Sequence, residues 1–588
     1  MGYFQELTLS LVLITMISCL GALQYGYNFW ILYSSVLVEE ELNQGDLHVS
    51  SRHTDPKILL LELTIAIFPT GGILGSLIFA FLVDRFGRKR TMLLNDILSV
   101  LCAILLRWFK MINSFSLSFI TRFAAGICTG IFSTSVPMYL GEIAPVNLRG
   151  TIIEVCLFFM SLGIAVAQAV SLPEFLGNEQ GSPVLFGLTG IGALFQLVLL
   201  LFLPESPRYL LIQKKQEREA KEVLKKLRGS HYTEDEIEEL YQEDQYEQQE
   251  KGMRVHRMLC SSRQSWPLRC SIILTVGQQL SGIKASLCSF LFSSFGQAFQ
   301  FRKEDFFPFM ASLTVPVSHA GILLDLVAYY YRDGVLKSMG IGDENVSRLI
   351  LGATCLLMMT HIAVICGIDA WGRRILLLCG FGICSISCIL LTMTLEIETP
   401  ISWLPYLSTV LVLILTGAHI LGPGSVPIVL TTELFLQSSR SSAYAIVGSV
   451  HWFCSCIVTL GFHHIQSYIG PYSFLIFFPF NSVALFYSLM VVPETKRKTF
   501  LSIRKLLEML PSKSLGNKQE ANEEAVQESI TPSGGRRESR DRKGSLQRDG
   551  RSESLQCDGR RQSLRSDGRR ESVPRDGRRM SVQRGRMQ

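Results

Sequence analysis

Apolar runs of about 20 residues recur along this 588-residue chain, and that is the length an α-helix needs to cross the hydrocarbon core of a bilayer. Hydrophobic residues make up 48% of the chain and charged residues only 18%, which excludes an ordinary soluble globular protein. The sequence therefore predicts an all-α membrane protein. Its twelve predicted transmembrane helices lie at 7–32, 58–82, 91–109, 115–140, 151–172, 184–203, 267–292, 349–368, 375–396, 403–428, 441–466 and 471–492.

Two short charged blocks, Asp84–Arg90 and Asp369–Arg374, each follow an apolar run and lie about half the chain apart. Both contain an acid, two further residues, a glycine and an arginine. A repeated turn of this kind at the end of a membrane-length segment indicates an internally duplicated membrane protein. Its two halves would present equivalent charged turns on the same membrane face.

The distribution of basic residues predicts the orientation. Arginines and lysines follow predicted spans 2, 4, 6, 8 and 10, whereas the opposite loops 173–183, 396–400 and 467–470 contain none. Because basic loops stay on the cytoplasmic side, both termini are predicted to be cytoplasmic in a multi-pass protein of the cell membrane.

The region 204–266 between spans 6 and 7 is polar, with charges of both signs at helical spacing. Such a composition favours short solvated helices. We expect it to be a cytoplasmic helical linker domain between two six-helix bundles, 1–203 and 267–510.

Short motifs occur in a fixed order along about 480 residues of the chain, and together they are far more specific than any one of them. They are Tyr25–Asn28, Arg122–Gly126, Glu142–Pro145, Arg149-Gly150, Gln278–Gly282, Gly422–Pro427, Glu433, Arg440 and Pro493–Thr495. In this order the motifs resemble those of the facilitative hexose transporters, the sugar-porter branch of the major facilitator superfamily. The resemblance implies the major facilitator fold, alternating access and no enzymatic activity. No cofactor, metal or nucleic acid is expected.

In that family, charged residues at the cytoplasmic helix ends pair when the transporter faces outward and separate when it opens inward. Several weak pairs together can bias a two-state equilibrium. The alternative is that these charges only orient the helices in the membrane. The residues predicted to form this cytoplasmic salt-bridge latch are Arg88, Glu142, Arg149, Asp369, Arg373, Arg374, Glu433 and Arg440.

Hexoses carry hydroxyl groups and no charge, so their recognition requires neutral hydrogen-bonding side chains and an apolar surface for the ring. Polar residues inside spans are costly and usually functional, although a lone glutamine can also join helices and a lone histidine can be a satisfied core residue. The predicted substrate-binding residues are Tyr25, Gln168, Gln278, Gln279, His419, His451 and Trp452.

The first span indicates how transport is driven. Proton-coupled relatives carry an acid where this chain has Asn28, which cannot exchange a proton. Glu62 and Glu154 are predicted to lie near span ends within reach of water. Uniport is therefore favoured over proton-coupled symport.

Three segments favour fructose over glucose as the substrate. Glucose-preferring members usually carry a tryptophan where this chain has Ile428. The pair His451-Trp452 and the segments Glu433–Arg440 and Gly470–Phe474 resemble the fructose-transporting subgroup. We expect fructose to be preferred, with glucose as a further substrate.

Residues 284–326 resemble an insert within span 7. The family continues directly from Ile283 to a tyrosine-rich turn, but here Tyr329 to Tyr331 follow only after this stretch. The insert is interpreted as a retained non-coding stretch or splice form, or alternatively as a lid. A non-transporting sugar sensor or inert isoform therefore stays a third hypothesis, beside uniport and symport.

The tail 511–588 is predicted to be disordered, with nine-residue repeats from Arg536 onward. Residues 536–588 contain 17 Lys/Arg against 8 Asp/Glu, so this stretch carries a charge of +9. Paired arginines precede four serines at the spacing that basophilic kinases favour, and anionic membrane lipid is a further expected partner. A passive solvated extension is the alternative. The predicted phosphorylation sites are Ser539, Ser563, Ser572 and Ser581.

Overall fold

A computed structural model describes residues 6–31, 56–112, 115–172, 174–176, 181–229, 234–248, 255–261, 264–282, 343–397 and 404–507. Within these residues the regular structure is helical throughout. The predicted insert 284–326, the tail 511–588 and the four predicted phosphorylation sites lie outside them. The helices before the linker are α1 (Leu9–Ile31), α3 (Pro56–Phe86), α4 (Arg88–Ile112), α5 (Phe115–Ile143), the turn η2 (Val146–Leu148), α6 (Arg149–Val170) and α7 (Ser182–Leu200).

The linker region contains a π-helical turn and three short helices, followed by the second set of long helices. The linker elements are η3 (Tyr209–Gln213), α8 (Glu217–Arg228), α9 (Glu234–Gln248) and α10 (Val255–Cys260). The second set is α11 (Ser265–Gln279), α15 (Asp343–Trp371), α16 (Arg373–Glu396), α17 (Leu404–His419), η5 (Ile420–Gly424), α18 (Val426–Leu434), α19 (Gln437–Ile469), η6 (Gly470–Ile476) and α20 (Phe477–Met490).

Ten helices in the described part of the chain are long and apolar enough to cross a membrane. They correspond to predicted spans 1–5 and 8–12. The described apolar stretch of α7, Gly187–Leu200, is shorter than a full span, and α11 is followed closely by residues outside the description. The prediction of an all-helical membrane protein is confirmed, and the count of twelve spans stays a prediction.

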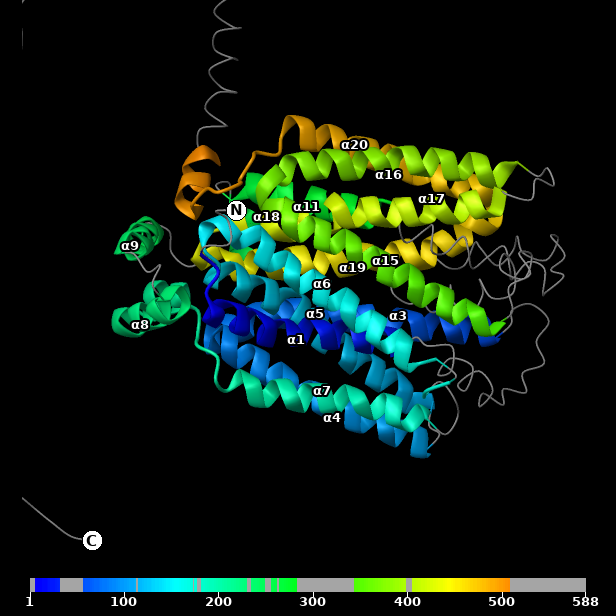
Figure 1. The fold of residues 1–588 in the computed structure, drawn as a ribbon, viewed down its shortest axis with the longest axis horizontal. Coiled ribbons are helices and arrows are strands. Elements are labelled where there is room, and N and C mark those ends of the chain that lie inside the picture. Colours follow the sequence, from blue (N-terminus) through cyan, green and yellow to red (C-terminus); the bar gives the residue numbers. More distant parts are fainter. Residues whose placement is uncertain are drawn as a thin grey trace, which may run out of the picture. The chain divides into compact units, whose positions relative to one another are not determined.

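The long helices lie side by side, while α8 and α9 lie together at one end of them (Figure 1). We call this the α8/α9 end. In the first set α1 packs against α6, α3 against α5, and α4 against α7. In the second set α16 packs against both α17 and α20. The two sets contact each other mainly through α3 with α19 and α6 with α15.

Helix backbones in the first set approach each other directly at glycines. A Cβ atom on Gly26 of α1 would lie 1.9 Å from the Met160 carbonyl oxygen of α6. A Cβ atom on Gly126 of α5 would lie 1.9 Å from the Phe68 carbonyl oxygen of α3. No larger side chain fits at either position, so these glycines let the helices pack backbone to backbone.

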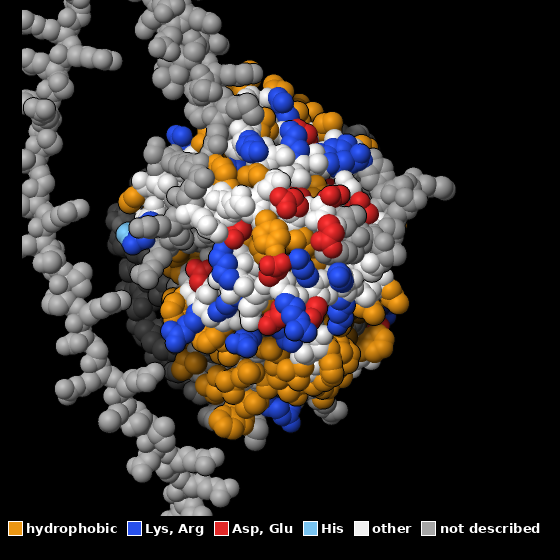
Figure 2. Space-filling model, turned by 90° about the vertical axis from the view of Figure 1, so that its left-hand side faces the viewer, with side chains coloured by type: hydrophobic (Ala, Val, Ile, Leu, Met, Phe, Trp, Pro, Cys, Tyr) orange, Lys and Arg blue, Asp and Glu red, His pale blue; other side chains and the backbone are white. Residues whose placement is uncertain are grey.

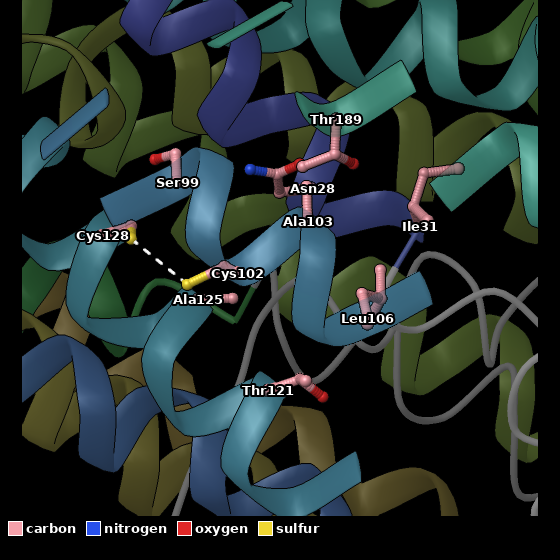
Figure 3. A pocket seen from close by; sticks show the side chains of 10 residues that line it. All are labelled: Asn28, Ile31, Ser99, Cys102, Ala103, Leu106, Thr121, Ala125, Cys128 and Thr189. Carbon is pink, nitrogen blue, oxygen red and sulfur yellow. Dashed lines mark hydrogen bonds between the residues drawn. The ribbon is translucent and has the colours of Figure 1, made fainter. Parts of the chain in front are cut away.

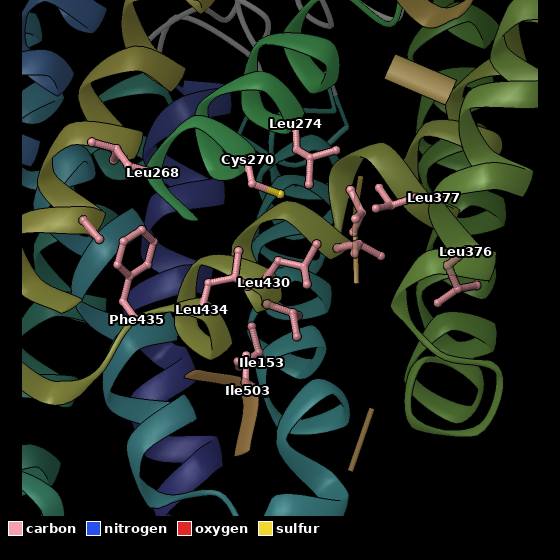
Figure 4. Packing of buried hydrophobic residues seen from close by; sticks show 14 of the residues in the cluster. Ile153, Leu268, Cys270, Leu274, Leu376, Leu377, Leu430, Leu434, Phe435 and Ile503 are labelled. Carbon is pink, nitrogen blue, oxygen red and sulfur yellow. The ribbon is translucent and has the colours of Figure 1, made fainter. Parts of the chain in front are cut away.

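A large buried hydrophobic cluster joins the second set of helices to α6. Leu274 of α11, Leu377 of α16 and Leu430 of α18 are fully buried, and Ile153 of α6 packs among them (Figure 4). Ile503, near the end of the described chain, belongs to the same cluster. The segment after α20 is therefore anchored in the core.

The outward surface of the helices is apolar. Phe81, Phe195, Phe202 and Val483 are each more than half exposed. Viewed from the α8/α9 end, basic and acidic side chains cover the face, and hydrophobic side chains are gathered below them (Figure 2). A charged end on an apolar belt is the surface expected of a protein that lies in lipid.

Candidate functional site

The polar centre of the second set lies where α11, α19 and η5 meet. Gln279 Nε2 lies 2.7 Å from His451 Nδ1, and Gln278 Nε2 donates to the Gly424 carbonyl oxygen at 2.9 Å. Gly424 belongs to η5, a π-helical turn that contains Pro423 and interrupts the predicted tenth span. Such turns are frequent at functional sites because they redirect backbone groups. The structure thus brings together three predicted sugar-binding residues.

His419 belongs to the same region. Its Nδ1 lies 2.8 Å from the Ser281 hydroxyl, which follows α11. His419 therefore ties the end of α17 to the end of α11, beside the interrupted tenth span.

An aromatic group connects this polar centre to the first set of helices. Trp452 of α19 is 2% exposed and stacks edge-on against His451, with ring centroids 5.5 Å apart. Its ring centroid lies 6.2 Å from that of Tyr25 of α1 and 6.0 Å from that of Phe68 of α3. The arrangement offers neutral hydrogen-bonding groups beside aromatic faces, which suits an uncharged polyhydroxylated ligand.

Gln168 of α6 is buried, yet neither its amide oxygen nor its amide nitrogen has a hydrogen-bond partner among the described residues. A buried amide without partners is costly, because both groups lose their bonds to water. A glutamine that joins two helices has a hydrogen-bond partner on the neighbouring helix. Gln24, for example, donates to Gln196 at 2.5 Å across α1 and α7.

A small pocket lies within the first set of helices, apart from the polar centre. Asn28, Ser99, Thr121 and Thr189 contribute its polar lining, from α1, α4, α5 and α7 (Figure 3). Asp96, one turn before Ser99 on α4, is fully buried. Sequence reasoning did not single out Asp96, although an acid inside an apolar run is an available signal.

The charged residues at the α8/α9 end form two matching clusters. In the first, the Arg88 guanidinium donates to both Glu142 carboxylate oxygens at 2.9 Å, and both side chains are fully buried. In the second, Arg373 donates to both Glu433 oxygens at 3.2 and 2.7 Å. The duplicated turns of the sequence thus hold equivalent arginine–glutamate pairs.

A further acid supports each turn in the same way. Glu205 accepts from the backbone N–H of Arg88 at 3.0 Å, and Glu494 accepts from that of Arg373 at 3.2 Å. The preceding residues, Gly87 and Gly372, have φ values of +92° and +98°, a conformation that favours glycine. Glu494 lies in the motif Pro493–Thr495, and Glu205 lies at the start of the linker region, but their role in supporting the turns was not predicted.

Two contacts that buried acids make in this charged region cross between the sets. Arg440 of α19 lies 3.5 Å from Glu142 of α5. Asp369 of α15 binds Arg373 at 2.6 Å and also accepts from the Thr151 backbone N–H of α6 at 2.7 Å. The clusters of the two halves are therefore connected through two buried acids.

Arg149 lies against an aromatic ring in this network. The Arg149 guanidinium lies 3.7 Å from the centroid of the Phe500 ring and donates to the Lys498 carbonyl oxygen. Arg440 and Arg208 also lie over Phe500, at 4.2 and 4.5 Å. Phe500, which sequence reasoning missed, is thus surrounded by three guanidinium groups.

Arg374 lies apart from these pairs. Its backbone N–H donates to Glu494 at 3.1 Å and its guanidinium to the Leu489 carbonyl oxygen. Both contacts stay within the second half of the chain. Its membership of the latch therefore stays a prediction.

The linker helix α9 contacts the start of α19 through a buried carboxylate. Glu247 accepts from the Ser438 backbone N–H at 3.1 and 3.2 Å. Burial, together with the neighbouring charge of Glu243, raises the pKa of Glu247 to about 8. Glu243 itself pairs with Arg208, which follows the first set of helices. The α9 helix therefore contacts the start of α19 directly, and through Arg208 it contacts the segment that follows the first set of helices.

The expectation that Glu154 lies near water is wrong. Glu154 of α6 is fully buried, and its Oε1 lies 2.8 Å from Nδ1 of His361 on α15. The prediction failed because position near the end of a span does not tell whether a neighbouring helix covers the side chain. His361 was not predicted, although it is an ionisable residue inside an apolar run. The side chain of Glu62 lies outside the description.

Comparison with known proteins agrees with this architecture. A solved structure of the proton:xylose symporter XylE bound to 6-bromo-6-deoxy-D-glucose has a TM-score of 0.68 and 21% identity, covering 84% of this chain and 99% of that chain. An inward-open XylE structure from E. coli has a TM-score of 0.57. At this identity the likeness shows the fold alone. The chain therefore has the major facilitator fold.

The sequence comparisons are more specific. The family described as "Sugar (and other) transporter" matches residues 14–294 and 323–507. Solute carrier family 2, facilitated glucose transporter member 5, is 41% identical in Mus musculus over 86% of this chain and 93% of that protein. The Homo sapiens protein of the same name is 39% identical over 85% and 92%. Member 7 of Mus musculus is 37% identical. The chain belongs to the sugar transporter family, which confirms the resemblance in its motifs.

Proposed function

We propose that this protein is a facilitative uniporter that equilibrates a hexose across the membrane by alternating access. The observation that carries this proposal is the set of neutral groups around the polar centre, together with the unpartnered buried amide of Gln168. Sugar hydroxyls would supply the missing bonds. Family membership supports the same conclusion, as do the relatives, which are named facilitated glucose transporters.

Fructose is the proposed preferred substrate, with glucose as the weaker one. The sequence segments that resemble the fructose-transporting subgroup support this preference. Ile428, which stands where glucose-preferring members carry a tryptophan, packs against the hydrophobic cluster of the second set. An isoleucine at this position is smaller than a tryptophan. Pocket contacts of this kind change preference by only a few kcal/mol.

The transporter is proposed to contain twelve membrane helices in two bundles, 1–203 and 267–510, with both termini in the cytoplasm and 204–266 as a cytoplasmic linker domain. The charged α8/α9 end of the protein then lies on the cytoplasmic side of the cell membrane. Residues 284–326 are proposed to be an insert in the seventh span. The family match supports this, because its two ranges omit 295–322.

The paired charges at the α8/α9 end are proposed to be a latch that holds the cytoplasmic side closed. Support comes from the buried contact of Arg440 with Glu142 and from that of Asp369 with the Thr151 backbone. Rocking of the two bundles about a central site would separate both contacts. Phe500, surrounded by three arginines, would be released in the same movement.

Uptake of radiolabelled fructose and glucose into proteoliposomes tests the proposal. We expect each sugar to reach, and not exceed, its external concentration, with fructose entering faster, whether or not a pH gradient is imposed. Accumulation that requires the gradient would indicate symport instead. The same chain without residues 284–326 is the matched comparison. Transport only by the shortened chain would identify the full-length form as the non-transporting one.

A further inference from the structure

A buried acid–base pair joins the two halves of the molecule away from the charged clusters. Glu154 of α6 is fully buried, and His361 of α15 is 6% exposed. His361 Nδ1 lies 2.8 Å from Glu154 Oε1, and its Nε2 lies 2.9 Å from the Ser161 hydroxyl of α6. A protonated imidazole donates from both nitrogens, so one acceptor stands opposite each ring nitrogen.

This pair belongs to a series of contacts that join α6 to α15 along their length. Thr151 donates from its backbone N–H to Asp369 and from its hydroxyl to the Ile365 carbonyl oxygen. At the other end, Glu174 beyond α6 pairs with Arg348 of α15, and both of these side chains are about half exposed. The buried Glu154–His361 pair lies between these two ends. Opening of the interface between α6 and α15 from the α8/α9 end would therefore let water reach the Glu154–His361 pair.

The charge on this pair depends on one proton. With His361 protonated, the ion pair is neutral overall. Loss of that proton leaves the Glu154 carboxylate buried without a counter-charge, which is costly in a low-dielectric interior. When the interface opens, water solvates both groups, and the proton can leave to the aqueous phase at little cost. The closed interface therefore holds a proton that the open interface can release.

The neighbouring elements contribute few competing charges. The Ser425 hydroxyl, just before α18, is a neighbour of the Glu154 carboxyl and carries no charge. On α1 the nearby titratable group is Cys19, which contacts Cys156. Charged groups whose partners are described above are Glu142 on α5, Arg373 and Arg374 on α16, Glu433 on α18, and Arg149 and Asp369 on α6 and α15 themselves. The packed elements also carry Arg122 on α5, Glu396 on α16 and His419 on α17, of which His419 contacts Ser281.

We propose that Glu154 and His361 form a proton-binding site that couples pH to the access equilibrium: the bound proton stabilises the closed interface between α6 and α15. This inference rests on the proposed alternating-access function and deepens it. Protonation would adjust how readily the bundles separate, without a proton accompanying each sugar. The ratio of open to closed interface should then rise with pH, by up to about tenfold per pH unit where one proton is released.

Hydrogen exchange of the full-length protein in lipid nanodiscs, corrected for intrinsic exchange rates from pH 5.5 to 8.5, tests the proton site. We expect the protection of α6 and α15 at the α8/α9 end to fall as pH rises. Glu154→Gln should abolish or reverse this slope, because no buried carboxylate then needs a counter-charge. His361→Gln should move its midpoint, since the remaining acid takes up the proton itself. Glu174→Gln, which cuts the exposed pair between the same helices, should leave the slope unchanged.

A wild-type interface whose protection does not change with pH would overturn the proposal, as would a slope that survives both Glu154→Gln and His361→Gln. Transport is measured separately in proteoliposomes that contain a pH-sensitive dye. Absence of hexose equilibration at every pH would refute the proposed function, while the exchange data would still decide the proton site. Hexose-driven proton flux that Glu154→Gln abolishes would overturn both uniport and the adjusting role of the pair.

Discussion

Gln168 shows at the level of one residue what sequence can and cannot predict. A glutamine inside an apolar span indicates function, because the bilayer excludes polar groups. Sequence alone does not distinguish it from Gln24, which occupies a similar environment. Only the structure shows that Gln24 is bonded to Gln196 while the amide of Gln168 has no partner among the described residues.

The first prediction concerns these amides. Gln168→Ala and Gln279→Ala should each weaken fructose binding by about 1–3 kcal/mol, because a desolvated sugar hydroxyl loses its partner. Binding to the purified protein, measured by calorimetry, gives the dissociation constants. Gln24→Ala is the matched control, since it removes an intramembrane amide that already has a partner. It should lower thermal stability and leave affinity unchanged.

Gln437, in contrast, is unsuitable as an inert control although it lies beyond the tenth span. Its side-chain oxygen accepts from Arg440 at 2.6 Å, and it is fully buried. Gln437 and Glu154 illustrate one limit of sequence reasoning, because burial at a helix end depends on packing partners from distant parts of the chain.

For the first prediction, equal loss of affinity in the Gln24 and Gln168 variants would show that the sugar lies elsewhere.

At the scale of elements, the length of the apolar runs predicted most of the long helices to within a few residues. The interrupted tenth span was also predictable, since Gly422–Pro427 contains two glycines and two prolines. The contact of α9 with the start of α19 was not predictable. It depends on Glu247, which on a solvated helix of mixed charge looks like any other surface acid.

The second prediction concerns this contact. The raised pKa means that docked Glu247 keeps a proton that a free carboxyl group has already lost above pH of about 4.5. The stabilisation is complete below that pH and disappears as pH rises through about 8. Docking of α9 should therefore be weaker at pH 9 than at pH 6, by about 1–3 kcal/mol. Hydrogen exchange in α9, corrected for intrinsic rates at each pH, measures the free energy of docking.

Glu247→Gln should remove most of this pH dependence, because the amide oxygen can still accept from Ser438 and carries no charge. Glu217→Gln on α8 is a suitable control, since that acid lies in an exposed pair with Lys221. An unchanged pH profile in the Glu247 variant would assign the titration to another group.

At the scale of the whole molecule, the duplicated charged turns predicted the two matching clusters. The sequence did not show that the clusters are joined unequally. Arg440 contacts both Glu142 and Phe500, whereas Arg149 contacts Phe500 and the Lys498 carbonyl oxygen. Phe500 lies in the segment after α20 and outside both duplicated turns, so the repeat could not predict this arrangement.

The third prediction tests the connection between the halves. Arg440→Ala leaves Glu142 with one fewer buried counter-charge and should cost about 3–5 kcal/mol. The loss should appear as a lower melting temperature and as a larger population open at the α8/α9 end, measured by spin-label distances. Lys215→Ala is the control, because it removes an ion pair with Asp244 in which the lysine is largely exposed. It should change the melting temperature and the open population only a little. Similar effects of the two variants would refute the latch.

The fourth prediction concerns the tail. With a charge of +9, residues 536–588 should bind anionic vesicles, with about 1 kcal/mol from each basic residue near the surface. Each phosphate adds roughly −1.5 to −2 charges, so modification of Ser539, Ser563, Ser572 and Ser581 by a basophilic kinase should release the peptide. Cosedimentation with vesicles before and after kinase treatment measures this. Equal binding after phosphorylation would indicate a passive extension.

The glycine contacts in the first set of helices have a mechanical consequence. Where Gly26 and Gly126 bring backbones together, there are no flexible side chains to absorb a displacement. That part of the molecule must then turn as a stiff lever and cannot bend locally. The displacement that a small rotation produces grows in proportion to the distance from the pivot. Small movements around a sugar would therefore become larger separations at the helix ends.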